Sequence, residues 1–232
     1  MGKQVYRWLD RWWATVFPVR CVLCDAATDQ NRDLCTACLN DLPRLHQVCP
    51  GCGVAMPVEI NQRCGRCLNE PPAFDSVWAP FSYEFPLDGL IQKFKFGDRL
   101  VYGRLLARLM LETGRPLLPE LLVPVPLHPT RLRERGFNQA TELALHLGRE
   151  LGLPVSRTLL KRTRDTPAQA GLDAARRRAN LNRAFDLQGV LNHQHVALVD
   201  DVMTTGSTAH RCARTLKSAG ATRVDIWVCA RA

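Results

Sequence analysis

The chain has 232 residues, enough for one or two domains with a substantial hydrophobic core. Its hydrophobic content of 46% and charged content of 23% are those of a globular protein, and no apolar run approaches the ~20 residues that span a bilayer. A formal charge of +9 suits phosphorylated ligands or nucleic acid. The N-terminus has neither a signal-peptide core nor a small-residue cleavage site, so we expect a cytoplasmic protein, in which paired cysteines bind metal more often than they form disulfides.

Apolar residues recur at helical spacing before the first cysteine, at Val5, Trp8, Leu9, Trp12, Trp13, Val16 and Phe17. They predict an amphipathic helix within residues 1–20. Such a helix can pack on its own protein or lie on a membrane surface. Because its polar face carries few cations, we expect residues 1–20 to dock the following module on the rest of the chain.

Eight of the ten cysteines form four Cys-x-x-Cys pairs within residues 21–68, namely Cys21/Cys24, Cys35/Cys38, Cys49/Cys52 and Cys64/Cys67. Two cysteines separated by two residues can turn both sulfurs toward one ion, and two such pairs complete a tetrahedron. The pattern predicts a small double zinc-ribbon-like module with two closed, structural Zn²⁺ sites. Consecutive pairing is the simplest arrangement, and interleaved pairing is the alternative. Cys212 and Cys229 are expected to be buried small apolar residues.

A Pro-rich linker at residues 69–73 leads into a second domain, residues 74–232, in which strand and helix patterns alternate. We expect strands at residues 76–83, 121–126, 195–202 and 224–230. Helices are expected at residues 87–96, 100–111, 137–151 and from about 207 to 218. This alternation predicts an α/β fold with a mainly parallel sheet flanked by helices.

Two basic segments interrupt this pattern. In the first, residues 123–139, Arg131, Arg133 and Arg135 follow an expected strand and precede Gly-Phe-Asn-Gln, which favours anion binding over a solvated helix face. The second, residues 157–183, carries eight cations against Asp165 and Asp173. A polar stretch of this length is either a lid over a site or an exposed charged linker.

Residues 196–208 carry the strongest functional pattern. A buried strand ends on Asp200 and Asp201, at the edge where parallel sheets place their ligands. The loop Thr-Thr-Gly-Ser-Thr follows, in which Gly206 allows close approach of the backbone, and the hydroxyls and the next helix's N–H groups can donate to an anion. Helix capping, the alternative role for the acids, needs only one carboxylate. The segment therefore predicts a pocket for a phosphorylated ribose.

This order of residues resembles the sequence with which type I phosphoribosyltransferases bind phosphoribosyl pyrophosphate (PRPP). The resemblance implies that Asp200 and Asp201 hold the ribose hydroxyls, and that the 5′-phosphate is held by Thr204, Thr205, Gly206, Ser207 and Thr208. It also implies a pyrophosphate-binding loop formed by the backbone of Leu127 and His128 with Arg131 and Arg135, and it favours the lid interpretation of residues 157–183. Family members that use hypoxanthine or guanine have an Asp base at the position of Thr204, which argues against a salvage enzyme of that kind.

The cysteine pairs, Pro-Leu-His-Pro at residues 126–129, Arg-Gly-Phe-Asn-Gln at residues 135–139 and the PRPP loop together resemble the ComF family, from about Cys21 to Arg231. Members join a zinc module to a phosphoribosyltransferase-like domain and are linked to natural competence and the use of external DNA. The resemblance implies Mg²⁺-dependent transfer of ribose 5-phosphate from PRPP to an acceptor that the sequence does not identify, with Asp200, Asp201 and Arg135 at the reacting centre. The alternative is a PRPP-sensing or single-stranded-DNA-processing factor without turnover, whose partners are DNA or competence and recombination proteins.

Overall fold

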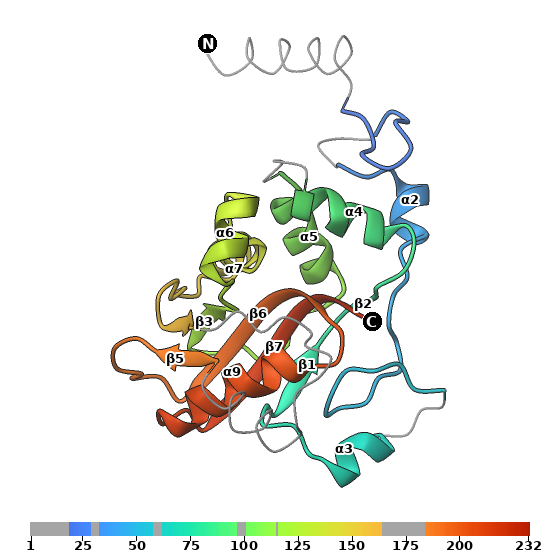
Figure 1. Ribbon diagram of the computed structural model, residues 1–232. Coiled ribbons are helices and arrows are strands. Elements are labelled where there is room, and N and C mark those ends of the chain that lie inside the picture. The colour runs from blue at the N-terminus through green and yellow to red at the C-terminus, as the bar shows by residue number, and fades with distance from the viewer. Residues whose placement is uncertain (1–18, 29–32, 58–61, 97–100, 115, 164–183) are drawn as a thin grey trace, which may run out of the picture.

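The computed structural model of the chain describes residues 19–28, 33–57, 62–96, 101–114, 116–163 and 184–232 (Figure 1). Residues 1–18 of the expected docking helix and residues 164–183 of the expected lid lie outside these ranges. Among the described residues, no helix is long and apolar enough to cross a membrane.

A parallel sheet forms the centre of the fold, as expected. Its strand order is β1 (Ser76–Trp78), β7 (Arg223–Arg231), β6 (His195–Met203) and β3 (Leu121–Pro124), and β2 (Phe81–Ser82) also pairs with β7. All of these pairs are parallel. The single strand expected at residues 76–83 is divided into β1 and β2 by Ala79 and Pro80, since proline has no N–H to donate to a ladder.

Helices cover both faces of the sheet (Figure 1). Helices α4 (Leu87–Phe96), α5 (Val101–Glu112) and α7 (Gln139–Leu151) pack on one face, and α9 (Ser207–Ser218) packs on the other. Along β6, Ala197 and Val199 face the three helices, whereas Val196 and Leu198 face α9. Because both faces are buried, the strand needs a continuous apolar run rather than an alternating one.

Helix α6 (Pro129–Arg135) was not expected as a separate element, and it changes the local picture of the first basic segment. The side chain of His128 accepts a hydrogen bond from the backbone N–H of Thr130 at the helix start, and Pro129 occupies the first turn. Gly136 ends the helix with a left-handed φ of 76°. Arg131 and Arg135 therefore lie on a short helix, as in the helix-face alternative.

A small antiparallel pair, β4 (Leu160–Arg162) with β5 (Phe185–Leu187), joins the two ends of the second basic segment. Phe185, the first residue of β5, is buried against the α9 side of the sheet. Strand β4 lies within the expected lid, residues 157–183, and pairs with β5, which follows that segment.

The cysteine-rich module contributes two short helices, α2 (Thr36–Asn40) and α3 (Gly65–Asn69). Leu34 and Leu42 of its first half join the same core cluster as α4 and α5, and Asp33 pairs with Arg104 of α5 at 3.5 Å. Between the halves, the backbone of residues 43–45 bonds to that of residues 80–82 at the sheet edge. Figure 1 shows α2 near α4, and α3 at the other end of the sheet.

Asp225 of β7 is expected to be a main polar support of this fold. It is 2% exposed and accepts hydrogen bonds from Ser76 Oγ at 2.8 Å and Arg223 Nε at 3.0 Å, and it lies 2.8 Å from His195 Nε2. Asp225→Asn should lower the free energy of unfolding by about 1–3 kcal/mol, because it removes the charge these donors share. Urea unfolding measures this change. The exposed Asp186→Asn is the control, and equal stability of the two variants would refute the role.

Candidate functional site

The acid pair lies at the carboxyl end of β6, within the last residues of the strand. Asp200 is half-buried and Asp201 is 7% exposed. Asp200 Oδ1 accepts a hydrogen bond from the backbone N–H of Asp201 at 2.9 Å. Burial, and next the negative charge of Asp201, raise the pKa of Asp200 well above its ordinary value. A ligand that donates hydroxyl groups here would relieve this unfavourable placement of charge.

Lys95 of α4 is a site residue that the sequence did not reveal. Its Nζ lies 3.1 Å from Asp201 Oδ2, and it also lies 5.9 Å from the ring centre of Tyr83. The ammonium group thus offsets one of the two buried negative charges. Lys93 and Lys95 look alike in the sequence, and only the packing of α4 on the sheet shows that Lys95 is the inward one.

The hydroxyl-rich loop follows β6 directly. Gly206 adopts a left-handed φ of 76° at the start of α9, which favours glycine. The Oγ atoms of Thr205 and Ser207 lie 2.9 Å apart, and the N–H of Ser207 donates to Thr205 Oγ1 at 3.3 Å. A small cavity of about 60 Å³ is lined by Asp200 and by residues 202–209 together. The structure thus brings Asp200 and the predicted phosphate ligands, residues 204–208, to one place, whereas Asp201 does not line this cavity.

The first basic segment reaches the same edge of the sheet. Leu127 and His128 follow β3, whose Pro124 pairs with Val199 of β6, the residue before the acid pair. Arg135 Nη1 donates to Gln139 Oε1 at 3.1 Å, and Gln139 Nε2 donates to the carbonyl of Lys95 at 3.4 Å. A series of polar contacts therefore connects Arg135 through Gln139 and Lys95 to Asp201. Arg131 is exposed and is not a member of this series.

The two basic segments meet at an open depression of about 660 Å³. Its wall includes Leu127 and Asn138 from the first segment, and Arg157 and Thr158 from the beginning of the second. The predicted pyrophosphate loop and the first residues of the predicted lid are therefore neighbours.

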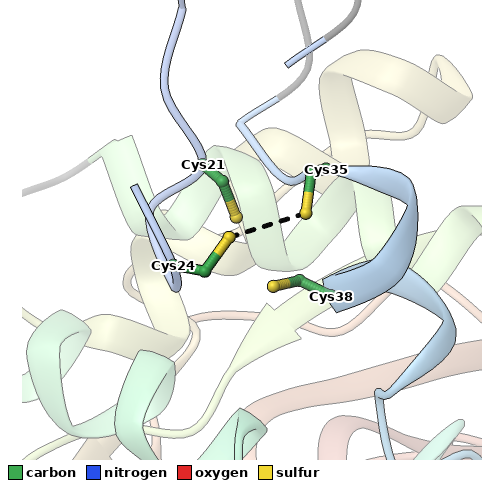
Figure 2. A group of neighbouring side chains, drawn as sticks. All are labelled: Cys21, Cys24, Cys35 and Cys38. Atoms are coloured by element: carbon green, nitrogen blue, oxygen red, sulfur yellow. Dashed lines mark hydrogen bonds between the residues drawn. The ribbon is translucent and has the colours of Figure 1, made fainter. Parts of the chain in front are cut away.

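The eight paired cysteines form two groups of four, one from Cys21, Cys24, Cys35 and Cys38 and the other from Cys49, Cys52, Cys64 and Cys67. In each group all sulfurs lie within 4.8 Å of one another, which confirms the consecutive pairing and excludes the interleaved one. Figure 2 shows the first group, whose Cys24 and Cys35 sulfurs are 3.7 Å apart. Four sulfurs at about 2.3 Å from one Zn²⁺ ion lie about 3.8 Å apart, so the geometry fits zinc and excludes a disulfide.

Backbone N–H groups support the thiolate form that zinc requires. Burial raises the pKa of Cys21, but N–H groups of Cys35, Cys24 and Leu23 outweigh it and lower the pKa to about 6. Burial and N–H groups act in the same opposed way on Cys49, whose pKa falls to about 7. The N–H of Cys64 donates to Cys49 Sγ at 3.2 Å. Cys212 and Cys229 are fully buried on α9 and β7, as expected.

The second cysteine group and the hydroxyl-rich loop face each other across a cleft of about 290 Å³. Cys52, Arg66 and Cys67 line it from the module, and Thr205, Ser207 and Arg211 line it from the loop and α9. His210, for which the sequence suggested no site role, closes one end. Its Nδ1 accepts a hydrogen bond from the N–H of Ala73 at 3.1 Å, which ties the linker to α9.

Comparison with known proteins gives consistent matches. Residues 12–68 match the double zinc ribbon domain. Competence protein F of Haemophilus influenzae is 37% identical, and the match covers 93% of this chain and 98% of that protein. DNA utilization protein YhgH of Escherichia coli K12 is 35% identical, over 91% of this chain and 89% of that protein. Competence protein ComFC of Streptococcus pneumoniae is 27% identical, over 81% and 83%.

Among solved structures, the glutamine PRPP amidotransferase from B. subtilis, complexed with ADP and GMP, matches with a TM-score of 0.40 and 18% identity. The match covers 59% of this chain and 30% of that enzyme.

Asp200→Asn should stabilise the fold. The folded-state pKa of Asp200 lies above that of the unfolded chain, so ionisation at neutral pH favours unfolding. An amide removes this penalty and keeps the acceptor for the N–H of Asp201. We expect a melting temperature (Tm) about 2–4 °C higher at neutral pH, equivalent to about 1 kcal/mol. The gain should shrink as the pH falls toward the ordinary carboxyl pKa. The exposed Asp186→Asn serves as the control, and an unchanged or lower Tm for Asp200→Asn at neutral pH would contradict this account.

Metal analysis should find two zinc ions per chain, one for each group of four cysteines. Cys24→Ser should leave one, because a closed site that loses a thiolate binds zinc far more weakly. Cys212→Ala, which removes a buried cysteine outside both groups, should retain two. Two ions in Cys24→Ser, or none in the unchanged chain, would overturn the assignment.

Proposed function

This chain belongs to the competence protein F (ComF) family, and from this we propose that it is a cytoplasmic PRPP-binding phosphoribosyltransferase. It would transfer ribose 5-phosphate to an acceptor in DNA uptake and utilisation or in nucleotide metabolism. The single observation that carries the proposal is the convergence of Asp200 and the loop residues 204–208 on one cavity at the end of β6. Carboxylates next to an array of hydroxyl and N–H donors match a ligand with ribose hydroxyls at one end and a phosphate at the other.

The proposed roles follow from the chemistry of each group. Asp200 and Asp201 would accept hydrogen bonds from the ribose hydroxyls, while the contact with Lys95 Nζ orients the Asp201 carboxylate. The loop N–H groups and hydroxyls would hold the 5′-phosphate. Transfer breaks the bond between C1′ and the pyrophosphate oxygen, which leaves with the electron pair, and forms a bond from C1′ to the acceptor nucleophile.

Neutralising the leaving group is the larger task, because the ribose acquires oxocarbenium character as pyrophosphate departs. Arg135 is the candidate on this chain, since it donates to Gln139, which donates to the backbone carbonyl of Lys95 on α4. Mg²⁺ bound with PRPP would supply further positive charge, because this ion is commonly held by carboxylates together with substrate phosphates. Residues 157–163, fixed by β4, would bring cations toward the same depression.

The alternative is a protein that senses PRPP or processes single-stranded DNA without turnover. The names of the relatives and the net charge of +9 favour a DNA-related role. Single-strand binding commonly uses exposed aromatic side chains on which bases stack. Phe137 in the first basic segment and Phe185, which follows the second, are packed instead: Phe185 is 5% exposed, and the Phe137 ring lies 5.9 Å from that of Phe94. These segments therefore offer charge without a stacking surface.

Calorimetry with PRPP and Mg²⁺ tests the site. We expect binding by the unchanged chain and a loss of about 100-fold or more in the variant Asp200→Asn with Asp201→Asn, since charged hydrogen bonds contribute about 1.5–3 kcal/mol each. Asp186→Asn, outside the site, should bind normally. Equal affinity of all three proteins would rule out the assigned site.

Turnover separates the two functions. Pyrophosphate release would be measured with bases, nucleosides and oligonucleotides as acceptors. Release that depends on one acceptor and disappears in the Asp200→Asn, Asp201→Asn variant supports the transferase. PRPP binding or salt-sensitive oligonucleotide binding without release from any acceptor supports the alternative.

A further inference from the structure

Arg231, at the end of β7, joins the second cysteine group to the hydroxyl-rich loop. Its Nε donates to the carbonyl of Cys52 at 3.1 Å. Its Nη1 donates to the carbonyl of Met203 at 3.0 Å and also contacts the carbonyl of Thr204. One guanidinium group therefore contacts the backbone of a zinc-ligand residue and the backbone from which the loop starts.

Because Arg231 is buried, its contacts restrict where the carbonyls that it binds can lie. The residue is 8% exposed, and its Nη1 also contacts the terminal oxygen of the neighbouring Ala232. A buried cation is tolerated only where its N–H groups are satisfied, so displacing any of these carbonyls is unfavourable. The planar fork of arginine also fixes the directions of its donors, which a lysine ammonium does not. The positions of the Cys52 and Met203 carbonyls are thus tied to each other.

The Cys52 carbonyl is itself placed by the metal-binding turn. The N–H of Gly53 donates to the carbonyl of Cys49 at 2.8 Å, and the N–H of Cys49 donates to the carbonyl of Val54 at 2.8 Å. A short turn of this kind, held by few apolar contacts, depends on its metal for a fixed conformation. Loss of zinc from this site would release the Cys52 carbonyl, one of the backbone oxygens that orient Arg231.

The first cysteine group has no equivalent link. It is anchored on the helical side, where Asp33 pairs with Arg104 and Leu34 packs in the core cluster of α4 and α5. Within the described ranges, no hydrogen bond or ion pair joins residues 21–38 to the loop. The two zinc sites should therefore differ in their effect on the loop, although their cysteine spacings are nearly the same.

We propose that Arg231 is a positioning residue that couples zinc in the second site to the conformation of the loop at residues 203–208. Zinc in this site holds the loop ready for its ligand, and a ligand in the loop raises the affinity of this site for zinc, because coupling between two binding sites is reciprocal. The first zinc site takes no part. The ordering of the loop is independent of any ligand, whereas the reciprocal effect rests on the proposed binding of PRPP.

Hydrogen exchange of the full-length chain tests the first half of the proposal without PRPP. We expect residues 203–209 to exchange about tenfold faster in Cys64→Ser, which disables the second site, and in Arg231→Met, which keeps most of the apolar stem. Cys24→Ser and Arg104→Met are the matched controls, since they remove a ligand and an arginine from the first site's side. Arg231→Lys keeps the charge without the fork and should still exchange faster than the unchanged chain.

Core strand β6 supplies the internal reference in each sample. If residues 196–199 keep their protection while residues 203–209 lose it, the variant is folded and the effect is local. Equal exchange of residues 203–209 in the second-site and first-site variants would overturn the coupling. So would normal loop protection in an Arg231→Met protein that retains both zinc ions.

Zinc release to a chelator tests the reciprocal half. At equilibrium, PRPP with Mg²⁺ should raise the chelator concentration needed to remove one of the two ions from the unchanged chain and the single remaining ion from Cys24→Ser, and should have no such effect in Arg231→Met. If calorimetry shows PRPP binding but release is unaffected, the reciprocal coupling is wrong. If PRPP does not bind at all, the proposed function fails, and the exchange experiment alone decides whether Arg231 couples the zinc site to the loop.

Discussion

The electrostatic constraint at the end of β6 governs how the surrounding elements are placed. Residues 196–199 are completely buried, so Asp200 and Asp201 emerge from the sheet into a poorly solvated position. Two adjacent carboxylates there repel each other, and burial adds to the raised pKa of Asp200. The ammonium group of Lys95 lies beside Asp201 and offsets its charge. This contact requires α4 to lie against this end of the sheet. Gln139 Nε2 of α7 donates to the carbonyl of Lys95. Hydrogen bonds and an ion pair therefore connect α7 to α4, and α4 to Asp201 of β6. A carboxyl with a strongly raised pKa beside a second carboxylate and a cavity is typical of a ligand-binding site.

The cysteine-rich module contacts the α/β domain at two places, and the two contacts have different roles. Its first half fills the core cluster over α4 and α5, where Leu34 and Leu42 pack with the helices. Its second half reaches the opposite end of the sheet and meets the loop through Arg231. Between them, the backbone of residues 43–45 bonds to that of residues 80–82 and covers the edge formed by the short strand β2. The module therefore contributes to the core, the sheet edge and the candidate site at once, and a division near residue 70 remains a prediction from composition.

The parts that the sequence predicted are those whose causes are local. The apolar run before Asp200, the turn at Gly206 and the amphipathic pattern of α9 are adjacent in the chain and fold as expected. The four Cys-x-x-Cys pairs predicted both metal groups, because ligand spacing is itself the signal. Helix α6 was not predicted, although Pro129 and Gly136 are ordinary start and stop residues. Lys95, His210 and Arg231 could not be found in this way. Each of these side chains contacts residues that are distant in sequence. The residues next to it in the chain do not indicate which part of the protein it will contact.

The two ends of the candidate site differ in what holds them. At the loop end, Arg231 donates to the carbonyl of Met203 and to the carbonyl of Cys52 in the second cysteine group. The Arg135 end is held by side-chain hydrogen bonds through Gln139 to α4, and it borders an open depression. A ligand with phosphate at one end and pyrophosphate at the other would contact both, with its C1′ between a preorganised loop and a more adjustable set of cations. Such a division suits transfer chemistry, because the phosphate that stays on the ribose needs a fixed position, whereas the leaving group needs cations that can follow it as charge develops.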